Sequence, residues 1–142
     1  MKSRDSRGNF ACLKRSACPI ANALDLLGDK WTLLVVRDLM FRGKRLYGEL
    51  AECEEGIPTN ILADRLKRLE EAGLVRKAPY QDRPVRYEYS LTASGKDLFG
   101  VIREIVRWAN KHIPGTGVPP KGFLKGTALA RPTRSRRRDP VA

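Results

Sequence analysis

The sequence predicts a mostly α-helical domain that carries one small β-hairpin. Apolar residues recur at helical spacing in four segments before residue 73 and in one segment after residue 92. Between them, LVRKAPY and VRYEYSL alternate β-branched or aromatic residues with charged ones, a pattern typical of strands. The intervening QDRP consists mainly of turn formers, so the two strands are expected to form a hairpin.

Three short helices are expected at the start of the fold. Pro19 suits the first position of a helix over PIANALDLL, and Gly28 suits its end. Asp29 can then cap a second helix, KWTLLVVRDLMF. A third short helix, LYGELAEC, is expected to direct Leu46 and Leu50 to the core.

A fourth helix, expected over Thr59–Ala72, has one apolar face. With Leu62 set at 0°, Leu66 falls at about 40° and Leu69 at about −20°, because each residue advances the helix by about 100°. These leucines predict a buried stripe. Small or polar residues occupy or flank the opposite, exposed face: Asn60, Ala63, Asp64, Lys67 and Arg68.

Beyond the hairpin, Thr92 can cap a final helix that runs from about Ala93 to His112. Its strong apolar stripe consists of Leu98, Val101, Ile102, Ile105 and Trp108. The predicted order of four helices, a hairpin and a helix is that of a winged helix-turn-helix. In that arrangement one helix can enter the major groove of DNA.

The charge of the chain is unevenly distributed. The net charge is +12 and the isoelectric point is about 10.1, which favours a polyanionic partner. Residues 1–17 contribute +4 and residues 114–142 contribute +6, so the span 18–113 contributes only +2. We therefore expect a basic N-terminal segment (1–17), a folded domain (18–113) and a basic, Pro/Gly-rich, flexible C-terminal tail (114–142). The isoelectric point alone does not predict that the domain binds nucleic acid.

Several classes of protein are disfavoured by composition. No apolar run approaches the roughly 18 residues of a membrane span, and MKSRDSRGNF lacks the apolar region of a secretory signal, so we expect a cytoplasmic protein without a membrane partner. Three cysteines without metal-ligand spacing argue against a disulfide scaffold or a zinc site. With a single histidine and no paired carboxylates at catalytic spacing, neither an enzyme nor a metal or cofactor site is expected.

The exposed face of the fourth helix has residue types that suit the reading of a DNA groove. Asn60 can pair with adenine, Lys67 and Arg68 can reach guanine edges or phosphates, and Ala63 allows close approach. Asp64 leaves two interpretations open, because it can accept a hydrogen bond from a cytosine amine or pair with Arg68 at i+4. A solvated charged face is the alternative for the whole helix.

The tip of the hairpin carries two arginines, Arg83 and Arg86, on either side of Pro84. A rigid arginine there can lie on phosphates or enter the minor groove, although a merely soluble turn is the alternative. The helix, the hairpin and their spacing together favour DNA binding.

Four motifs in order resemble one known family. CPI at residue 18, GDKWT at residue 28, LADRLKRLE at residue 62 and YSLT at residue 89 are similar to the HxlR family of bacterial winged-helix transcriptional regulators. The likeness covers about Cys18 to His112. It implies a homodimer that binds a roughly palindromic operator in double-stranded DNA and controls transcription.

The resemblance also implies roles for individual segments. The recognition helix would be Thr59–Ala72, and the wing would be Tyr80–Tyr87. Arg45 and Tyr47 match positions that usually face the DNA backbone, with a helix-capping charge and a partly buried aromatic ring as the respective alternatives.

In the family, the first and last helices form the dimer interface. Both helices are unusually apolar in this sequence, although the same residues can also close the core of the monomer. The expected interface residues are Ile20, Leu24, Leu27, Leu98, Ile102, Ile105 and Trp108.

Cys18 directly precedes Pro19, so its sulfur can lie at the positive end of the first helix, a position that favours the reactive thiolate. Some family members sense oxidants or electrophiles through a cysteine at this position, which makes Cys18 a possible redox site. The alternative is a small, partly buried residue.

Two other functional classes remain open from the sequence. One is a protein-interaction module that uses the winged-helix fold without binding DNA. The other is a thiol oxidoreductase based on Cys18, although the sequence contains no CxxC motif.

Overall fold

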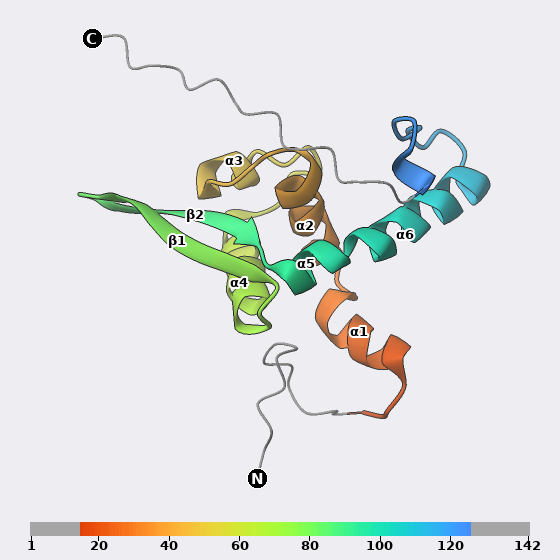
Figure 1. The fold of residues 1–142 in the computed structure, drawn as a ribbon, viewed down its shortest axis with the longest axis horizontal. Helices are drawn as coiled ribbons and strands as arrows, with labels where there is room; N and C mark the ends of the chain where they lie inside the picture. Colours follow the sequence, from red (N-terminus) through yellow and green to blue (C-terminus); the bar gives the residue numbers. More distant parts are fainter. Residues whose placement is uncertain (1–14, 126–142) are drawn as a thin grey trace.

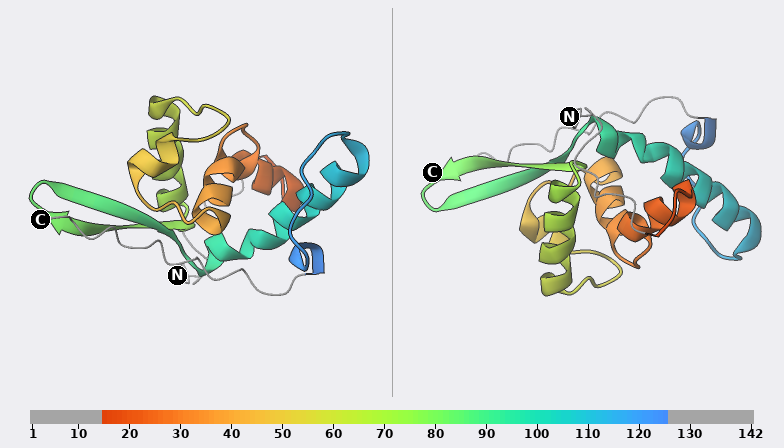
Figure 2. Two further views of the ribbon diagram at one scale, coloured as in Figure 1. Left: turned by 90° about the horizontal axis from the view of Figure 1, so that it is seen from above. Right: turned by 90° about the horizontal axis from the view of Figure 1, so that it is seen from below.

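The computed structural model describes residues 15–125. The hairpin projects from one end of the molecule, and the last long helix lies toward the other end (Figures 1 and 2). The elements are α1 (Pro19–Leu27), α2 (Thr32–Phe41), α3 (Tyr47–Ala51), α4 (Thr59–Glu71), β1 (Val75–Asp82), β2 (Val85–Leu91), α5 (Ala93–Asp97), α6 (Phe99–His112) and the 3-10 turn η1 (Phe123–Lys125). Within residues 15–125, none of the helices is both long enough and apolar enough to cross a membrane.

The core is built around the leucine stripe of α4. Leu62, Leu66 and Leu69 are at most 2% exposed, as their helical spacing predicts. They join a buried cluster that includes Val36 of α2 and Leu50 of α3. Burying one such side chain stabilises a fold by about 1.5–3 kcal/mol, so this cluster fixes which face of α4 remains in water.

Asp29 binds the start of α2, as predicted, but the helix begins at Thr32, two residues later than expected, and its N-cap position is Trp31. Asp29 Oδ2 accepts hydrogen bonds from the backbone N–H groups of Trp31 (3.0 Å) and Thr32 (3.1 Å), two donors that lack partners within the helix. The cap fixes the turn between α1 and α2.

The hairpin pairs β1 and β2 in antiparallel register, from Val75 opposite Leu91 to Asp82 opposite Val85. Its base is anchored to the segment that precedes α3, because the Tyr89 N–H donates to the Arg45 carbonyl oxygen at 2.8 Å. The anchored base and the projecting tip form a wing, as predicted.

The final helix is predicted as one element, but the structure interrupts it at Leu98. The Leu98 N–H bonds to the Gly95 carbonyl oxygen three residues earlier, which closes α5 with a tight turn before α6 begins. Gly95 packs so closely on the hairpin base that an added Cβ would lie 2.1 Å from the Leu74 carbonyl oxygen. The predicted Thr92 cap is present, since its hydroxyl accepts from the Gly95 N–H at 3.2 Å.

The chain continues to pack beyond residue 113, where the sequence places the start of a flexible tail. The ring of Phe123 lies 5.3 Å from that of Phe41 and 5.4 Å from that of Phe99. Arg107 donates to the Leu124 carbonyl oxygen at 2.6 Å. A lone aromatic residue in a Pro/Gly-rich segment has no periodicity, so sequence patterns do not reveal this contact.

Most of the predicted basic segments, with Cys12, lie outside the described residues, in 1–14 and 126–142.

Candidate nucleic-acid interface

The predicted recognition face of α4 is open to solvent. Thr59, Asn60, Ala63, Asp64, Lys67 and Arg68 are all exposed. They lie on the side of α4 away from the buried leucines, so the helical-wheel prediction of the exposed face is confirmed. Their contacts with DNA remain predictions.

This face and the wing border the same groove. An open groove of about 600 Å³ runs between α4 and the hairpin. From α4 it is lined by Ala63, Leu66, Lys67, Glu70 and Glu71. Lys77 and Tyr89 line it from the hairpin, and Tyr47 lines it from α3. The exposed face of α4 and the hairpin therefore border one groove, in which Lys67 and Lys77 are accompanied by the carboxylates of Glu70 and Glu71.

The arginines of the wing are exposed at the hairpin tip. Arg83 lies in the turn between β1 and β2, and Arg86 is the second residue of β2. Within the described part of the chain, neither guanidinium forms an ion pair. Both cations are therefore available to a phosphate or a groove edge.

Lys77 lies on β1, outside the predicted wing of Tyr80–Tyr87, and was not predicted as a site residue. Its ammonium group lies 4.3 Å from the centre of the Tyr87 ring, a cation–π contact that holds the charge beside the groove. The sequence pattern places Lys77 on a strand, but it does not show this contact, because the hairpin register pairs Lys77 with Tyr89 and the ring that it meets belongs to the diagonal neighbour Tyr87.

Tyr47 holds the start of α4 in place. Its hydroxyl donates to the Thr59 carbonyl oxygen at 2.8 Å, and its side chain is only partly exposed. Because the single O–H is used in this contact, it does not donate to a phosphate in this arrangement.

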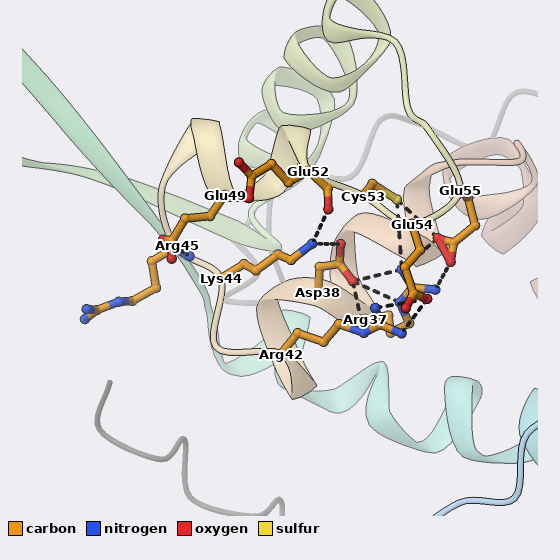
Figure 3. Close-up of polar contacts among 10 residues, drawn as sticks. All are labelled: Arg37, Asp38, Arg42, Lys44, Arg45, Glu49, Glu52, Cys53, Glu54 and Glu55. Carbon is orange, nitrogen blue, oxygen red and sulfur yellow. Dashed lines mark hydrogen bonds and ion pairs between the residues drawn. The ribbon is translucent and has the colours of Figure 1, made fainter. Parts of the chain in front are cut away.

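Arg45 lies at the junction of α3 and the wing. Its side chain is 62% exposed, and its guanidinium is 3.8 Å from the Glu88 carboxylate. Figure 3 shows the Arg45 guanidinium pointing away from the neighbouring polar cluster. Arg45 is thus a largely exposed cation beside the wing, with Glu88 as its partner.

An ion pair that the sequence analysis missed anchors the middle of α4. Arg65 Nε donates to Asp29 Oδ2 at 2.7 Å, and both side chains are largely buried. Partial burial alone would raise the pKa of Asp29, but hydrogen bonds from Thr32 and Arg65 outweigh it and lower the pKa to about 2. The pair joins α4 to the cap of α2.

Asp64 pairs with Arg65 and not with Arg68, the partner considered from the sequence. Arg65 is already fixed by Asp29 and lies beside Asp64 on the helix. Within residues 15–125, Arg68 forms no ion pair. Helical spacing predicts which charged residues lie near Asp64. It does not predict that Asp29, from the turn between α1 and α2, positions Arg65 to be the partner.

A cluster of charged residues around the buried Asp38 holds the segments that lead to α4 (Figure 3). Asp38 is 1% exposed and pairs with Arg37 at 2.9 Å and Lys44 at 3.1 Å. Arg37 also forms a two-pronged contact with Glu55, at 2.6 and 2.9 Å. These contacts join α2 to the turns on both sides of α3, so the angle of the helix-turn-helix is held by charge as well as by apolar packing.

The guanidinium of Arg37 also sets the ionisation of its partner. Its hydrogen bonds hold the pKa of Glu55 at about 2, and the contact with Glu55 raises the pKa of Arg37. Both groups are charged throughout the physiological range.

The predicted interface residues divide into two groups. Ile20, Leu24, Ile105 and Trp108 are 70%, 55%, 47% and 59% exposed. Ile102, in contrast, is only 8% exposed and belongs to the core of this chain, which is the alternative that the sequence left open for these residues. Leu27 and Leu98 are half-buried. α1 and α6 thus each present large apolar side chains to water, an arrangement that marks interaction surfaces.

Cys18 is an exposed free thiol directly before the first residue of α1. Its backbone carbonyl accepts hydrogen bonds from the backbone and side-chain nitrogens of Asn22, at 3.1 and 2.8 Å. The backbone of Cys18 is therefore fixed while its sulfur remains accessible.

Comparison with known sequences agrees with this architecture. The HxlR-like helix-turn-helix family matches residues 26–116. A Mycobacterium tuberculosis protein described as an uncharacterized HTH-type transcriptional regulator is 42% identical over 71% of this chain. The match spans 63% of that relative's length. A Bacillus subtilis protein of the same description, YvaP, is 36% identical over 68% of this chain and 89% of its own.

Solved structures agree as well. The reduced form of the transcriptional regulator YodB from B. subtilis superposes with a TM-score of 0.60 and 32% identity, over 72% of this chain and 100% of that chain. Its diamide-treated form gives a TM-score of 0.55 and 34% identity, over 67% and 94%. These relatives are named as transcriptional regulators and not as enzymes. The chain, with its four-helix core, its wing and its family match, belongs to the HxlR-like helix-turn-helix family.

Proposed function

We propose that this protein is a sequence-specific transcription regulator that binds double-stranded DNA. The observation that carries the proposal is the exposed face of α4, with Asn60, Lys67 and Arg68, which borders a groove shared with the hairpin. A helix held rigidly by its leucine stripe can insert its opposite face into a major groove, while a neighbouring ribbon contacts the backbone. Membership of the HxlR-like family supports the same conclusion.

Each side chain of the interface has a chemical task in this proposal. Asn60 reads adenine, and Lys67 and Arg68 bind guanine edges or phosphates. Arg83 and Arg86 bind the backbone or the minor groove beside the site, where A·T-rich DNA attracts arginine. Tyr47 acts by orienting α4.

The protein acts as a homodimer on a roughly palindromic operator. Ile20 and Leu24 of α1, with Ile105 and Trp108 of α6, supply exposed apolar area that a second copy can bury. Two-fold symmetry would place the recognition helices about 34 Å apart, so that both read successive major grooves on one face of DNA.

Cys18 makes the regulator responsive to thiol oxidation. Its exposed sulfur lies at the start of α1, a helix of the proposed dimer surface, so oxidation would alter the pairing of the subunits. The related YodB has been solved in reduced, diamide-treated and quinone-bound forms. We expect diamide to weaken operator binding by the wild type but not by Cys18→Ser; equal weakening of both would remove this role.

Fluorescence anisotropy with duplexes from the region upstream of the gene tests DNA binding. Lys67→Ala/Arg68→Ala and Arg83→Ala/Arg86→Ala should each weaken binding by at least tenfold at moderate salt. Lys111→Ala/Lys121→Ala, which removes the same charge from two exposed positions outside α4 and the wing, is the matched control and should bind nearly as the wild type does.

A protein-interaction module is the alternative function. It would be favoured if the α4 and wing variants kept full regulatory activity while DNA binding was absent from the wild type.

A further inference from the structure

We propose that Arg65 determines specificity at one position of the operator, by holding Asp64 so that its carboxylate accepts a hydrogen bond from the amine of a cytosine. This inference rests on the proposed DNA binding of α4. It assigns a task to a residue that points toward the protein and touches no DNA itself.

The first step is the anchoring of Arg65. Its Nε lies 2.7 Å from Asp29 Oδ2, and the two side chains are 16% and 23% exposed. Asp29 is itself immobilised, because the same oxygen accepts the backbone N–H groups of Trp31 and Thr32. The planar guanidinium is therefore held in one orientation, with its outer nitrogens directed by the fold.

The second step is the contact between Arg65 and Asp64. Arg65 Nη1 donates to Asp64 Oδ2, although Asp64 is 53% exposed. An ion pair between two mobile side chains at a surface holds neither of them firmly. Here one partner is already fixed, so less conformational freedom is lost when the carboxylate is oriented.

The third step concerns the free oxygen. An ionised carboxylate has two acceptor oxygens, and Arg65 occupies only Oδ2. Within the described residues, Asp64 Oδ1 has no hydrogen-bond partner. Asp64 lies one residue after Ala63 and three before Lys67, both of which line the groove between α4 and the wing. Asp64 does not itself line that groove, but it is exposed on the proposed reading face, and Oδ1 is the acceptor that it presents there.

The fourth step is the choice of base. In the major groove, cytosine presents an N4 amine donor, which a carboxylate can accept, whereas guanine and thymine present acceptors that repel it. Adenine also offers an amine, but next to an acceptor nitrogen. The positive charge of Arg65 further limits repulsion between Asp64 and the DNA phosphates. An oriented, partly neutralised aspartate therefore selects cytosine.

Selection of binding sites from a randomised duplex library tests the inference. Arg65→Lys keeps the charge and a contact with Asp29, but a single ammonium group cannot hold two carboxylates as a planar fork does. We expect Arg65→Lys to lose the cytosine preference at one position in each half-site by about tenfold, with the other positions unchanged. Asp64→Asn should lose the same position, and the double variant should lose no more than either single variant.

The matched control is Arg103→Lys, because Arg103 makes a comparable contact with its neighbour Glu104 on α6, at 3.3 Å. This variant should select the wild-type site. A general loss of fold would weaken every position alike, so the loss of one position separates the specificity role from a structural one. If Arg65→Lys unfolds, Asp64→Asn, which leaves the contact with Asp29 in place, decides the question.

An unchanged base preference in Arg65→Lys, or in Asp64→Asn where Arg65→Lys is unfolded, would overturn the inference while leaving DNA binding intact. If the wild type itself enriches no sequence, the proposed function fails and the inference fails with it.

Discussion

At the scale of single residues, two aspartates set the geometry of the helix-turn-helix. Asp29 joins the cap of α2 to Arg65 of α4. Asp38, which is 1% exposed, binds Arg37 and Lys44. A buried carboxylate is tolerated only when such partners compensate for the loss of water. The orientation of α4 thus depends on charges that never reach the DNA.

Asp29→Asn should destabilise the protein by about 1–2 kcal/mol at pH 7, because a weaker cap and a neutral partner of Arg65 remain. The pKa of Asp29 is lowered from 3.8 to about 2 in the folded state, so its stabilising effect is complete above pH 4 to 5 and is lost as the pH falls toward 2. Urea unfolding of both proteins at pH 7 and at pH 3 to 2 measures this. A stability difference that stays constant over that range would contradict the assignment.

Asp38→Asn should cost about 3–5 kcal/mol, because Arg37 and Lys44 lose their shared buried partner. Glu54→Gln is the control, since Glu54 is 72% exposed and, among residues 15–125, its one ion pair is with Arg42 at 3.3 Å. Its change in unfolding free energy should stay within about 0.5 kcal/mol. Similar losses for both variants would show that burial does not determine the effect.

At the scale of elements, the periodicity of the sequence predicted the faces of regular helices but not the features that depend on single contacts. The spacing of Leu62, Leu66 and Leu69 located both faces of α4, because a regular helix translates spacing directly into direction. The interruption at Leu98 and the packing of Phe123 depend on single close contacts between distant segments. The pairing of Asp64 with Arg65 likewise depends on Asp29, 35 residues earlier in the chain.

Tyr47→Phe should show whether Tyr47 orients α4 or contacts the DNA backbone. Loss of the hydrogen bond to Thr59 should lower the unfolding free energy by about 0.5–1.5 kcal/mol. Operator affinity should fall slightly, but its slope against salt concentration should not change, because no phosphate contact is removed. Affinities measured at several salt concentrations test this, with Arg86→Ala as the variant whose slope should decrease. A reduced slope in Tyr47→Phe would instead place the hydroxyl on DNA.

At the scale of the whole molecule, the surface proposed to bind DNA and the surface proposed to bind a second copy are separate: the first includes the wing, and the second consists of the apolar faces of α1 and α6. The wing projects from one end, and α6 lies toward the opposite one (Figure 1). The general location of both surfaces followed from the sequence. The sequence did not show which apolar residues remain exposed, because Ile102 has the same character as Ile105 but is packed into the core. Only the folded arrangement distinguishes the two.

Trp108→Asp should abolish the proposed dimer without unfolding the chain, because the side chain is 59% exposed and a charge there opposes burial against a second copy. Sedimentation at micromolar concentration should show a dimer for the wild type and a monomer for the variant. Val118→Asp, the same kind of change at a residue that is 90% exposed beyond α6, should remain dimeric. A monomeric wild type would exclude the symmetric arrangement.

The central claim is that α4 and the wing of each subunit bind DNA together, so that a symmetric dimer occupies two half-sites. Hydroxyl-radical footprinting of the upstream region tests it most directly. We predict two protected half-sites, centred about 10 base pairs apart on one face of the duplex, with protection lost in Lys67→Ala/Arg68→Ala. Uniform cleavage of the whole region by the wild-type protein, at low salt and with the thiols reduced, would contradict the account.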